Sequence, residues 1–152
     1  MRSGILKFSW LLAAAMAVVM FAGFPAAAEV QDACKGGETL DPKSLAAPGK
    51  VTLVEFTSPY CGPCLTLAPL LEQLASKRPD LVIKKVNINR PQVRTIDWRS
   101  PVAQQFGIRS VPHVVIFDPK GKVIAQGRPA MQQLMDWLWE TGLLNAGEKV
   151  KR

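Results

Sequence analysis

Two cysteines two residues apart, Cys61 and Cys64 in the stretch TSPYCGPCLTLAP, constrain the fold of this chain more than any other feature. The run before them, 51–56, is apolar and β-prone, and the segment 61–77 has leucines at helical spacing. These leucines are Leu67, Leu70, Leu71 and Leu74. The thiols therefore lie where a strand gives way to a helix. A pair in this place can be a redox pair, part of a metal site or a structural disulfide.

Metal binding and a purely structural role explain the pair less well than redox chemistry. A structural zinc site needs about four ligands, and the chain adds only Cys34 and His113, with no second C-x-x-C pair. Covalent haem attachment needs a histidine directly after Cys64, where this chain has Leu65. A disulfide across so short a loop removes little entropy from the unfolded chain and adds little stability.

A redox role has a physical basis in the helix expected to start at the motif. Cys61 would lie at the helix N-terminus, where unpaired N–H groups and the helix dipole favour a thiolate. Pro63 suits the first turn because it has no N–H, and Gly62 lets the chain bend tightly between the sulfurs. Cys64, one turn further, would be more buried and would resolve the mixed disulfide that Cys61 forms with a partner protein.

The rest of the pattern predicts an α/β domain. Strands are expected over 51–56, 81–88, 114–117 and 122–125, with helices over 61–77, 101–106 and about 130–144. The order βαβαββα predicts a central mixed sheet with helices on both faces. The length and apolar content suit one domain, expected over 50–145. A flexible, polar lead-in with at most a short helical turn is expected over 29–49, and a basic tail over 146–152.

The first residues have the layout of a secretory signal peptide. Arg2 and Lys7 precede the uncharged run 8–24, and Pro25 and three alanines follow, so cleavage is expected after Ala28. An uncleaved membrane anchor is the alternative, because the apolar run is at the lower limit for a span. In either case the domain would face the periplasm or another extracytoplasmic space.

The net charge is +7 for the full chain, and it falls to +5 without residues 1–28, which contain two basic residues and no acidic one. The basic residues are scattered and do not alternate with aromatic residues as stacking on nucleic acid requires, so no nucleic-acid partner is expected. The charge predicts a solvated surface with a mild preference for acidic partners.

The stretch LVEFTSPYCGPCLTLAPLLEQLA resembles the active-site segment of the thioredoxin family. KKVNI, FGIRSVPHVVIFDPKGKV and QG follow in the family's order, so that the resemblance covers about Lys50 to Leu144. It implies the thioredoxin fold, a three-layer α/β/α sandwich, and a protein-disulfide oxidoreductase that needs neither a cofactor nor a metal.

The resemblance also implies roles for individual residues. Pro112 matches the family's cis-proline, whose loop faces the two sulfurs, and Val111 would pair with the backbone of the bound substrate. Glu55 matches a buried acidic residue, usually Asp, that relays protons to or from the second cysteine. Lys85 matches the lysine that partners this acid, and Gly127 is expected to line the peptide groove.

The surface beside the sulfurs departs from the family pattern. Tyr60 replaces the usual tryptophan and keeps an aromatic wall, while Leu65 replaces a usual lysine and makes the surface more apolar. Tyr60, Gly62 and Pro63 are therefore expected to contact the substrate.

Three residues each keep two interpretations. Trp98, in the long connection 90–100, could dock a partner, although packing against the domain is favoured. Cys34 could trap a partner or bridge a dimer, and a passive thiol explains it as well. His113 could tune the thiolate or bind copper with the cysteine pair, but a groove residue that titrates near neutral pH is favoured.

Pro63 bears on the direction of electron flow. In strong thiol oxidants a histidine within the motif stabilises the reduced form, and a proline cannot do so. A monomeric reductant is therefore expected, which exchanges disulfides with exported proteins and uses a membrane-embedded electron donor or acceptor. A periplasmic thiol oxidant and a copper-binding or chaperone-like module are the alternatives.

Overall fold

The computed structural model describes residues 29–144. Its elements, in chain order, are β1 (Val30–Asp32), the 3-10 helix η1 (Pro42–Ser44), β2 (Val51–Thr57), α1 (Gly62–Lys77), β3 (Leu81–Asn87), α2 (Pro101–Gln105), β4 (His113–Phe117), β5 (Val123–Gln126) and α3 (Arg128–Glu140). The signal peptide predicted over 1–28 and the basic tail predicted over 146–152 lie outside the described residues.

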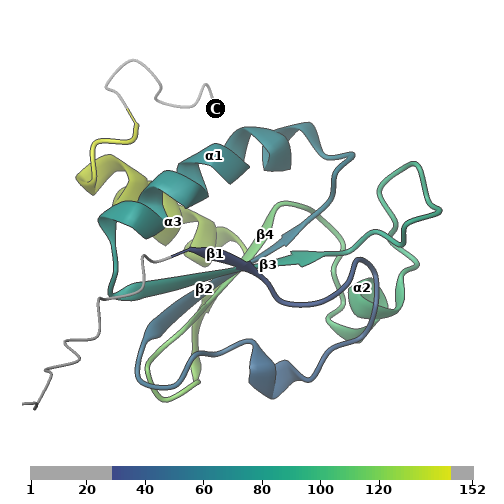
Figure 1. The fold of residues 1–152 in the computed structure, drawn as a ribbon, viewed down its shortest axis with the longest axis horizontal. Helices are drawn as coiled ribbons and strands as arrows, with labels where there is room; N and C mark the ends of the chain where they lie inside the picture. The colour runs from purple at the N-terminus through teal and green to yellow at the C-terminus, as the bar shows by residue number, and fades with distance from the viewer. Residues whose placement is uncertain (1–28, 145–152) are drawn as a thin grey trace, which may run out of the picture.

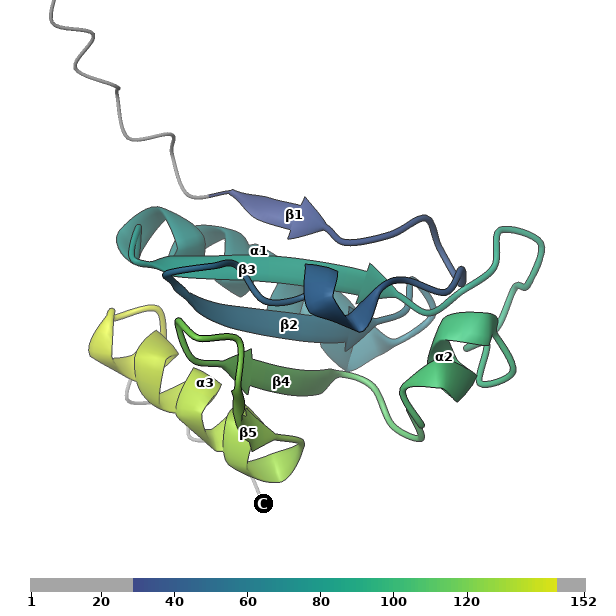
Figure 2. The ribbon, with the colours of Figure 1, turned by 90° about the horizontal axis from the view of Figure 1, so that it is seen from below.

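The strands form one mixed sheet in the order β1-β3-β2-β4-β5 (Figure 2). Strands β1, β3 and β2 are parallel, whereas β4 is antiparallel to β2 and β5 to β4. From β2 onward the elements follow the predicted order βαβαββα, so the predicted α/β fold is confirmed. Because β2 and β3 are parallel, their carboxyl ends meet at one edge of the sheet, where such folds commonly place their functional sites.

The segment 29–49 is more than the predicted flexible lead-in. Val30–Asp32 forms β1 and pairs in parallel with β3, which adds an edge strand that the sequence did not predict. The chain then follows the same edge, because Gly37 donates its N–H to the carbonyl of Asn87 at 2.9 Å. Three residues with two polar side chains carry almost no strand signal, and the strand exists because β3 offers it unpaired backbone groups. The predicted short helical turn is present at Pro42–Ser44.

Alternate residues of the central strands divide the core into two clusters. Leu53 of β2 packs with buried side chains of α1 and α3, whereas its neighbour Val54 packs with Leu45 and with Val102 of α2. Figure 1 shows α1 and α3 on one side of the sheet and η1 on the other. Of the four leucines at helical spacing in α1, Leu67, Leu71 and Leu74 are buried and Leu70 is partly buried. Leu134 and Leu138 of α3 are buried as well. The three-layer arrangement is therefore confirmed.

Helix α3 ends four residues earlier than predicted, at Glu140 rather than about Leu144. Gly142 has a φ of 70°, and the N–H groups of Leu143 and Leu144 turn back to the carbonyl of Leu138. A glycine in this left-handed conformation, with amides that turn back to the last helical turn, is a common helix C-terminus. In the described part of the chain, no helix has both the length and the apolarity needed to cross a bilayer.

Candidate active site

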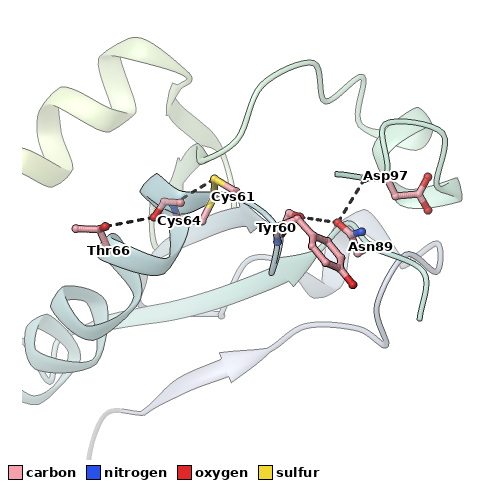
Figure 3. Close-up of a disulfide and its surroundings, with 8 residues drawn as sticks. Tyr60, Cys61, Cys64, Thr66, Asn89 and Asp97 are labelled. Carbon is pink, nitrogen blue, oxygen red and sulfur yellow. Dashed lines mark hydrogen bonds between the residues drawn. A yellow bond between two sulfur atoms is a disulfide. The ribbon is translucent and has the colours of Figure 1, made fainter. Parts of the chain in front are cut away.

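The cysteine pair forms a disulfide at the N-terminus of α1 (Figure 3). Cys61 is the N-cap residue, and its Sγ accepts a hydrogen bond from the backbone N–H of Cys64 at 3.2 Å. The predicted helix start at the motif is thereby confirmed. When the disulfide is reduced, this N–H and the positive end of the helix dipole both favour a thiolate at Cys61.

The two sulfur residues differ little in burial. Cys61 is 3% exposed and Cys64 is 1% exposed, so the structure distinguishes them by their position in the helix rather than by access. Pro63 lies in the first turn, as predicted. The prediction that the chain needs a glycine to bend between the sulfurs is wrong. Gly62 is already helical, and a Cβ there would meet nothing within 4 Å. Gly62 and Pro63 are both exposed beside the disulfide.

The predicted cis-proline is present, because the Val111–Pro112 peptide bond is cis. Pro112 lines a groove of about 330 Å³ with Gly127, His113 and, from α3, Met131. The structure thus brings Gly127 and Pro112 together in one groove. Val111 is partly buried and packs against the α2 side of the core.

Glu55 lies in the middle of β2 and is completely buried. Neither of its carboxylate oxygens has a hydrogen-bond partner. Burial is the largest influence and raises the pKa of Glu55 to about 7. The nearby polar side chain of Thr57, which does not meet the geometry of a hydrogen bond, and the positive charge of Lys85 lower this pKa by less. The burial of Glu55 was predicted from the resemblance. A carboxyl group with a pKa near neutrality can take up or release a proton under physiological conditions.

Lys85 lies beside Glu55 on the neighbouring strand, in the same register of the β2–β3 ladder. Its ammonium group, however, forms an ion pair with Glu72 of α1, at 3.6 Å between Nζ and Oε1. Lys85 therefore acts on the buried acid through the electric field of its charge and forms no ion pair with it. The lysine charge lowers the pKa of Glu55, while its direct contact is with an exposed carboxylate.

His113 is the first residue of β4 and lies in the wall of the groove, as predicted. Burial lowers the pKa of the imidazole, and one ring nitrogen lies 3.2 Å from the side-chain amide nitrogen of Gln126. Among residues 29–144, no group of three or more His, Cys, Asp or Glu side chains is placed to hold a metal ion. The copper alternative would need His113 together with both cysteines.

Large apolar side chains are exposed around the disulfide end of the molecule. Tyr60 is 40% exposed and Leu65 is 60% exposed, in line with the predicted aromatic and apolar surface. Trp98 is 38% exposed, so the favoured interpretation of a packed tryptophan is only partly correct. Cys34 is half-buried against the α2 side of the core, and burial is the largest cause that raises the pKa of its thiol.

The sequence did not predict a buried polar network that holds the turn before the cysteines. The Ser58 hydroxyl accepts the N–H of Tyr60 at 3.1 Å and donates to Oδ1 of Asn89 at 2.6 Å. The same oxygen accepts the N–H of Asp97 at 3.4 Å (Figure 3). Ser58, Asn89 and Asp97 are all buried, so the network fixes the active-site turn against the long connection between β3 and α2.

A mixed sheet that carries a cysteine pair at a helix N-terminus, with a cis-proline nearby, defines a dithiol-disulfide exchange protein. The family model for thioredoxin matches residues 41–140. The chain therefore belongs to the thioredoxin family, a family of protein-disulfide oxidoreductases.

The chain is similar in sequence to several thioredoxins. It is 38% identical to thioredoxin 1 of Nostoc over 98 residues, which cover 64% of this chain and 79% of that protein. It is 42% identical to thioredoxin 1 of Synechococcus elongatus over 65 residues, which cover 43% of this chain and 54% of that protein. The match thus spans about half the length of the Synechococcus protein.

Solved structures agree on the fold. Thioredoxin f from spinach chloroplast aligns with a TM-score of 0.53 at 24% identity, over 76% of this chain and 88% of that chain. Thioredoxin from Trypanosoma brucei brucei aligns with a TM-score of 0.54 at 20% identity, over 78% and 95%. At these identities the likeness concerns the fold alone.

Proposed function

We propose that this protein is an extracytoplasmic reductant of disulfides in exported proteins, with Cys61 as the attacking sulfur and Cys64 as the resolving one. The observation that carries the roles of the two cysteines is the hydrogen bond from the Cys64 N–H to the Cys61 Sγ at the start of α1. A sulfur that caps a helix receives both this N–H and the helix dipole, and it is therefore the sulfur whose thiolate is favoured.

The exchange runs in two displacements. The Cys61 thiolate attacks one sulfur of the partner's disulfide, so that a Cys61–partner bond forms and the partner's other sulfur leaves as a thiolate. The Cys64 thiol then loses its proton and attacks the Cys61 sulfur, which releases the partner's second thiolate. Two electrons pass to the partner, and the protein is left with the Cys61–Cys64 disulfide.

We assign to Glu55 the role of accepting the proton that Cys64 loses in the second displacement. Glu55 lies on β2, and Leu53, two residues earlier on the same face of the strand, packs against α1. With a pKa of about 7, a substantial fraction of Glu55 is ionised at neutral pH and can accept this proton. Water at the opened site would carry the proton between Cys64 and the carboxylate.

The direction and the compartment rest on sequence features. Pro63 between the cysteines offers no charge that would stabilise the reduced form, which favours a low reduction potential. The signal-peptide pattern of residues 1–28 favours export. In an oxidising compartment a reductant must be recharged, so a membrane-embedded electron donor is part of the proposal.

The equilibrium reduction potential of the Cys61–Cys64 pair tests the direction. A value near the thioredoxin end, about −270 mV, is expected, and a value near −120 mV would make the protein an oxidant. Catalysis is tested by the reduction of insulin with dithiothreitol as electron source. Cys61→Ser should abolish catalysis, and Cys34→Ser, which removes the thiol outside the pair, should retain it.

A further inference from the structure

The connection between β3 and α2, residues 90–100, is a fixed loop rather than a loose one. The buried side-chain amide of Asn89 donates to the carbonyls of Thr95 and Val93 within this loop. The same side chain accepts the hydroxyl of Ser58 from the active-site turn at 2.6 Å. One buried residue therefore holds the loop and the turn before Cys61 in a fixed relation.

A second contact closes the loop. The Arg90 guanidinium binds both carboxylate oxygens of Asp97, at 2.7 Å from Nε to Oδ2 and 3.0 Å from the terminal nitrogen to Oδ1. Oδ1 of Asp97 also accepts the N–H of Arg99 at 3.3 Å. Because Asp97 is buried and bonded on both oxygens, its two neighbours in the chain, Trp98 and Arg99, are presented outward from a rigid base.

Trp98 lies at the edge of a hollow of about 350 Å³, which we call the Trp98 hollow. Its lining combines an apolar surface from Trp98, Ala103 and Ile108 with the charged side chain of Arg109. Arg109, at the hollow, directly precedes Ser110, which lines the groove that contains the cis-proline Pro112. Consecutive residues of the chain, Arg109 and Ser110, therefore line the Trp98 hollow and the cis-proline groove.

The charged residues in the chain segment around this hollow are mostly positive. Between residues 89 and 112 the sequence has four arginines and a single acidic residue, Asp97, which is committed to Arg90. Arg99 and Arg109 are exposed and form no ion pair within the described residues. A partner that docks here would therefore meet an aromatic edge with positive charge beside it, and an acidic group would complement that charge.

We propose that the Trp98 hollow docks a segment of the partner protein in which an apolar side chain lies next to an acidic residue. The apolar side chain packs on Trp98 and Ile108, and the acidic group faces Arg109 or Arg99. This inference rests on the proposed function, because it concerns which disulfide-bearing proteins the site selects. It assigns the long loop to specificity, in addition to the contacts made at Pro112 and Gly127.

Binding without chemistry is the first test. Short labelled peptides carry a Leu-Asp pair at increasing distance from a serine that replaces the reacting cysteine, and matched peptides carry Leu-Lys instead. Fluorescence anisotropy with the oxidised protein should show preference for a Leu-Asp peptide, and this preference should weaken as salt is added. Trp98→Ala should weaken binding about tenfold, the effect of losing one aromatic anchor.

Two further variants sharpen the result. Arg109→Glu should shift the preference toward the Leu-Lys peptide, and because Arg109 is exposed, this change should leave the fold intact. Trp139→Ala is the matched control, since Trp139 is 48% exposed on α3 and should not affect binding. Equal affinity for both peptide types, or unchanged affinity in both Trp98→Ala and Arg109→Glu, would refute the proposal.

A kinetic measurement separates this proposal from the proposed function. The disulfide forms of the same peptides are compared with hydroxyethyl disulfide, a small neutral substrate that carries no Leu-Asp pair. Trp98→Ala should slow reduction of the Leu-Asp peptide and leave hydroxyethyl disulfide unaffected. If the unmodified protein reduces none of them, the proposed function fails while the binding result still decides the docking. If it reduces all of them and Trp98→Ala changes no rate, the docking fails alone.

Discussion

Replacement of Glu55 by glutamine should remove a pH dependence of stability that the buried carboxyl group imposes. In the folded protein burial raises the pKa of Glu55 from 4.5 to about 7. Between these two values the folded state holds a proton that the unfolded state has released. Stability therefore falls as pH rises through this window and is constant beyond it.

The size of the effect follows from the pKa difference. At about 1.4 kcal/mol for each pH unit between the two pKa values, the buried carboxylate destabilises the folded state by about 3 kcal/mol above pH 7.5. Glutamine has a similar shape and no charge, so Glu55→Gln should gain about 3 kcal/mol relative to the parent protein between pH 4 and pH 8. This gain is a large part of the stability of a domain of this size.

Denaturant unfolding of the oxidised protein, followed at pH values between 4 and 9, measures this difference directly. The disulfide keeps Cys61 and Cys64 from titrating. Hydrogen bonds and ion pairs with arginines hold the pKa of Asp80 and Asp97 below the usual value. These two groups therefore add stability that is lost on acidification, and this loss is the same in the parent protein and in Glu55→Gln, so it cancels in their difference.

The control is Glu72→Gln, the same chemical change at a half-exposed carboxylate that pairs with Lys85. It should differ from the parent protein by less than about 1 kcal/mol across the range. A difference between Glu55→Gln and the parent protein that does not vary with pH would refute the reasoning about Glu55.

Three further predictions concern packing, backbone and loop. Leu71→Ala should cost about 2–5 kcal/mol in denaturant unfolding because the side chain is fully buried, whereas Leu65→Ala at an exposed site should change little. Gly127→Ala should destabilise the domain by about 1–3 kcal/mol through its φ of 65°, although a Cβ there has room. Asp97→Asn should accelerate amide hydrogen exchange in residues 90–100, and unchanged exchange would contradict the role given to the Arg90 contact.

The parts of the site that could be predicted from the sequence are those with a local cause. Ser100 directly before Pro101 is a local pattern typical of a helix start, and the Ser100 hydroxyl accepts the N–H of Ala103 at 3.2 Å. The turn after β4 has Asp first, Pro second and Gly fourth, the residues that a type I turn prefers, and Gly121 donates its N–H to the carbonyl of Asp118 at 2.9 Å. Cys61 as a helix cap belongs to the same class, because the strand and helix patterns on either side determine where the helix begins.

The features that could not be predicted depend on residues far apart in the chain. The Ser58–Asn89 hydrogen bond joins residues 31 positions apart, and nothing near Ser58 indicates its partner. Lys85 lies beside Glu55 in the sheet, but its ion pair is with Glu72, because the packing of α1 on the sheet brings that carboxylate near. Opposite charges at Arg90 and Asp97 were a possible signal for the closed loop, though such pairs are common in loops that stay open.

Under the proposed function, the buried carboxyl group of Glu55 would couple the stability of the fold to the reactivity of the site. A carboxylate with no hydrogen-bond partner inside a sheet weakens the fold at neutral pH, and a neutral side chain of similar shape would remove that cost. The same burial brings the pKa of Glu55 close to the pH at which the resolving step must remove a proton from Cys64. Glu55→Gln should therefore stabilise the protein and slow the resolving step above pH 7. A single substitution that improves one property and impairs the other distinguishes a residue kept for chemistry from one kept for packing.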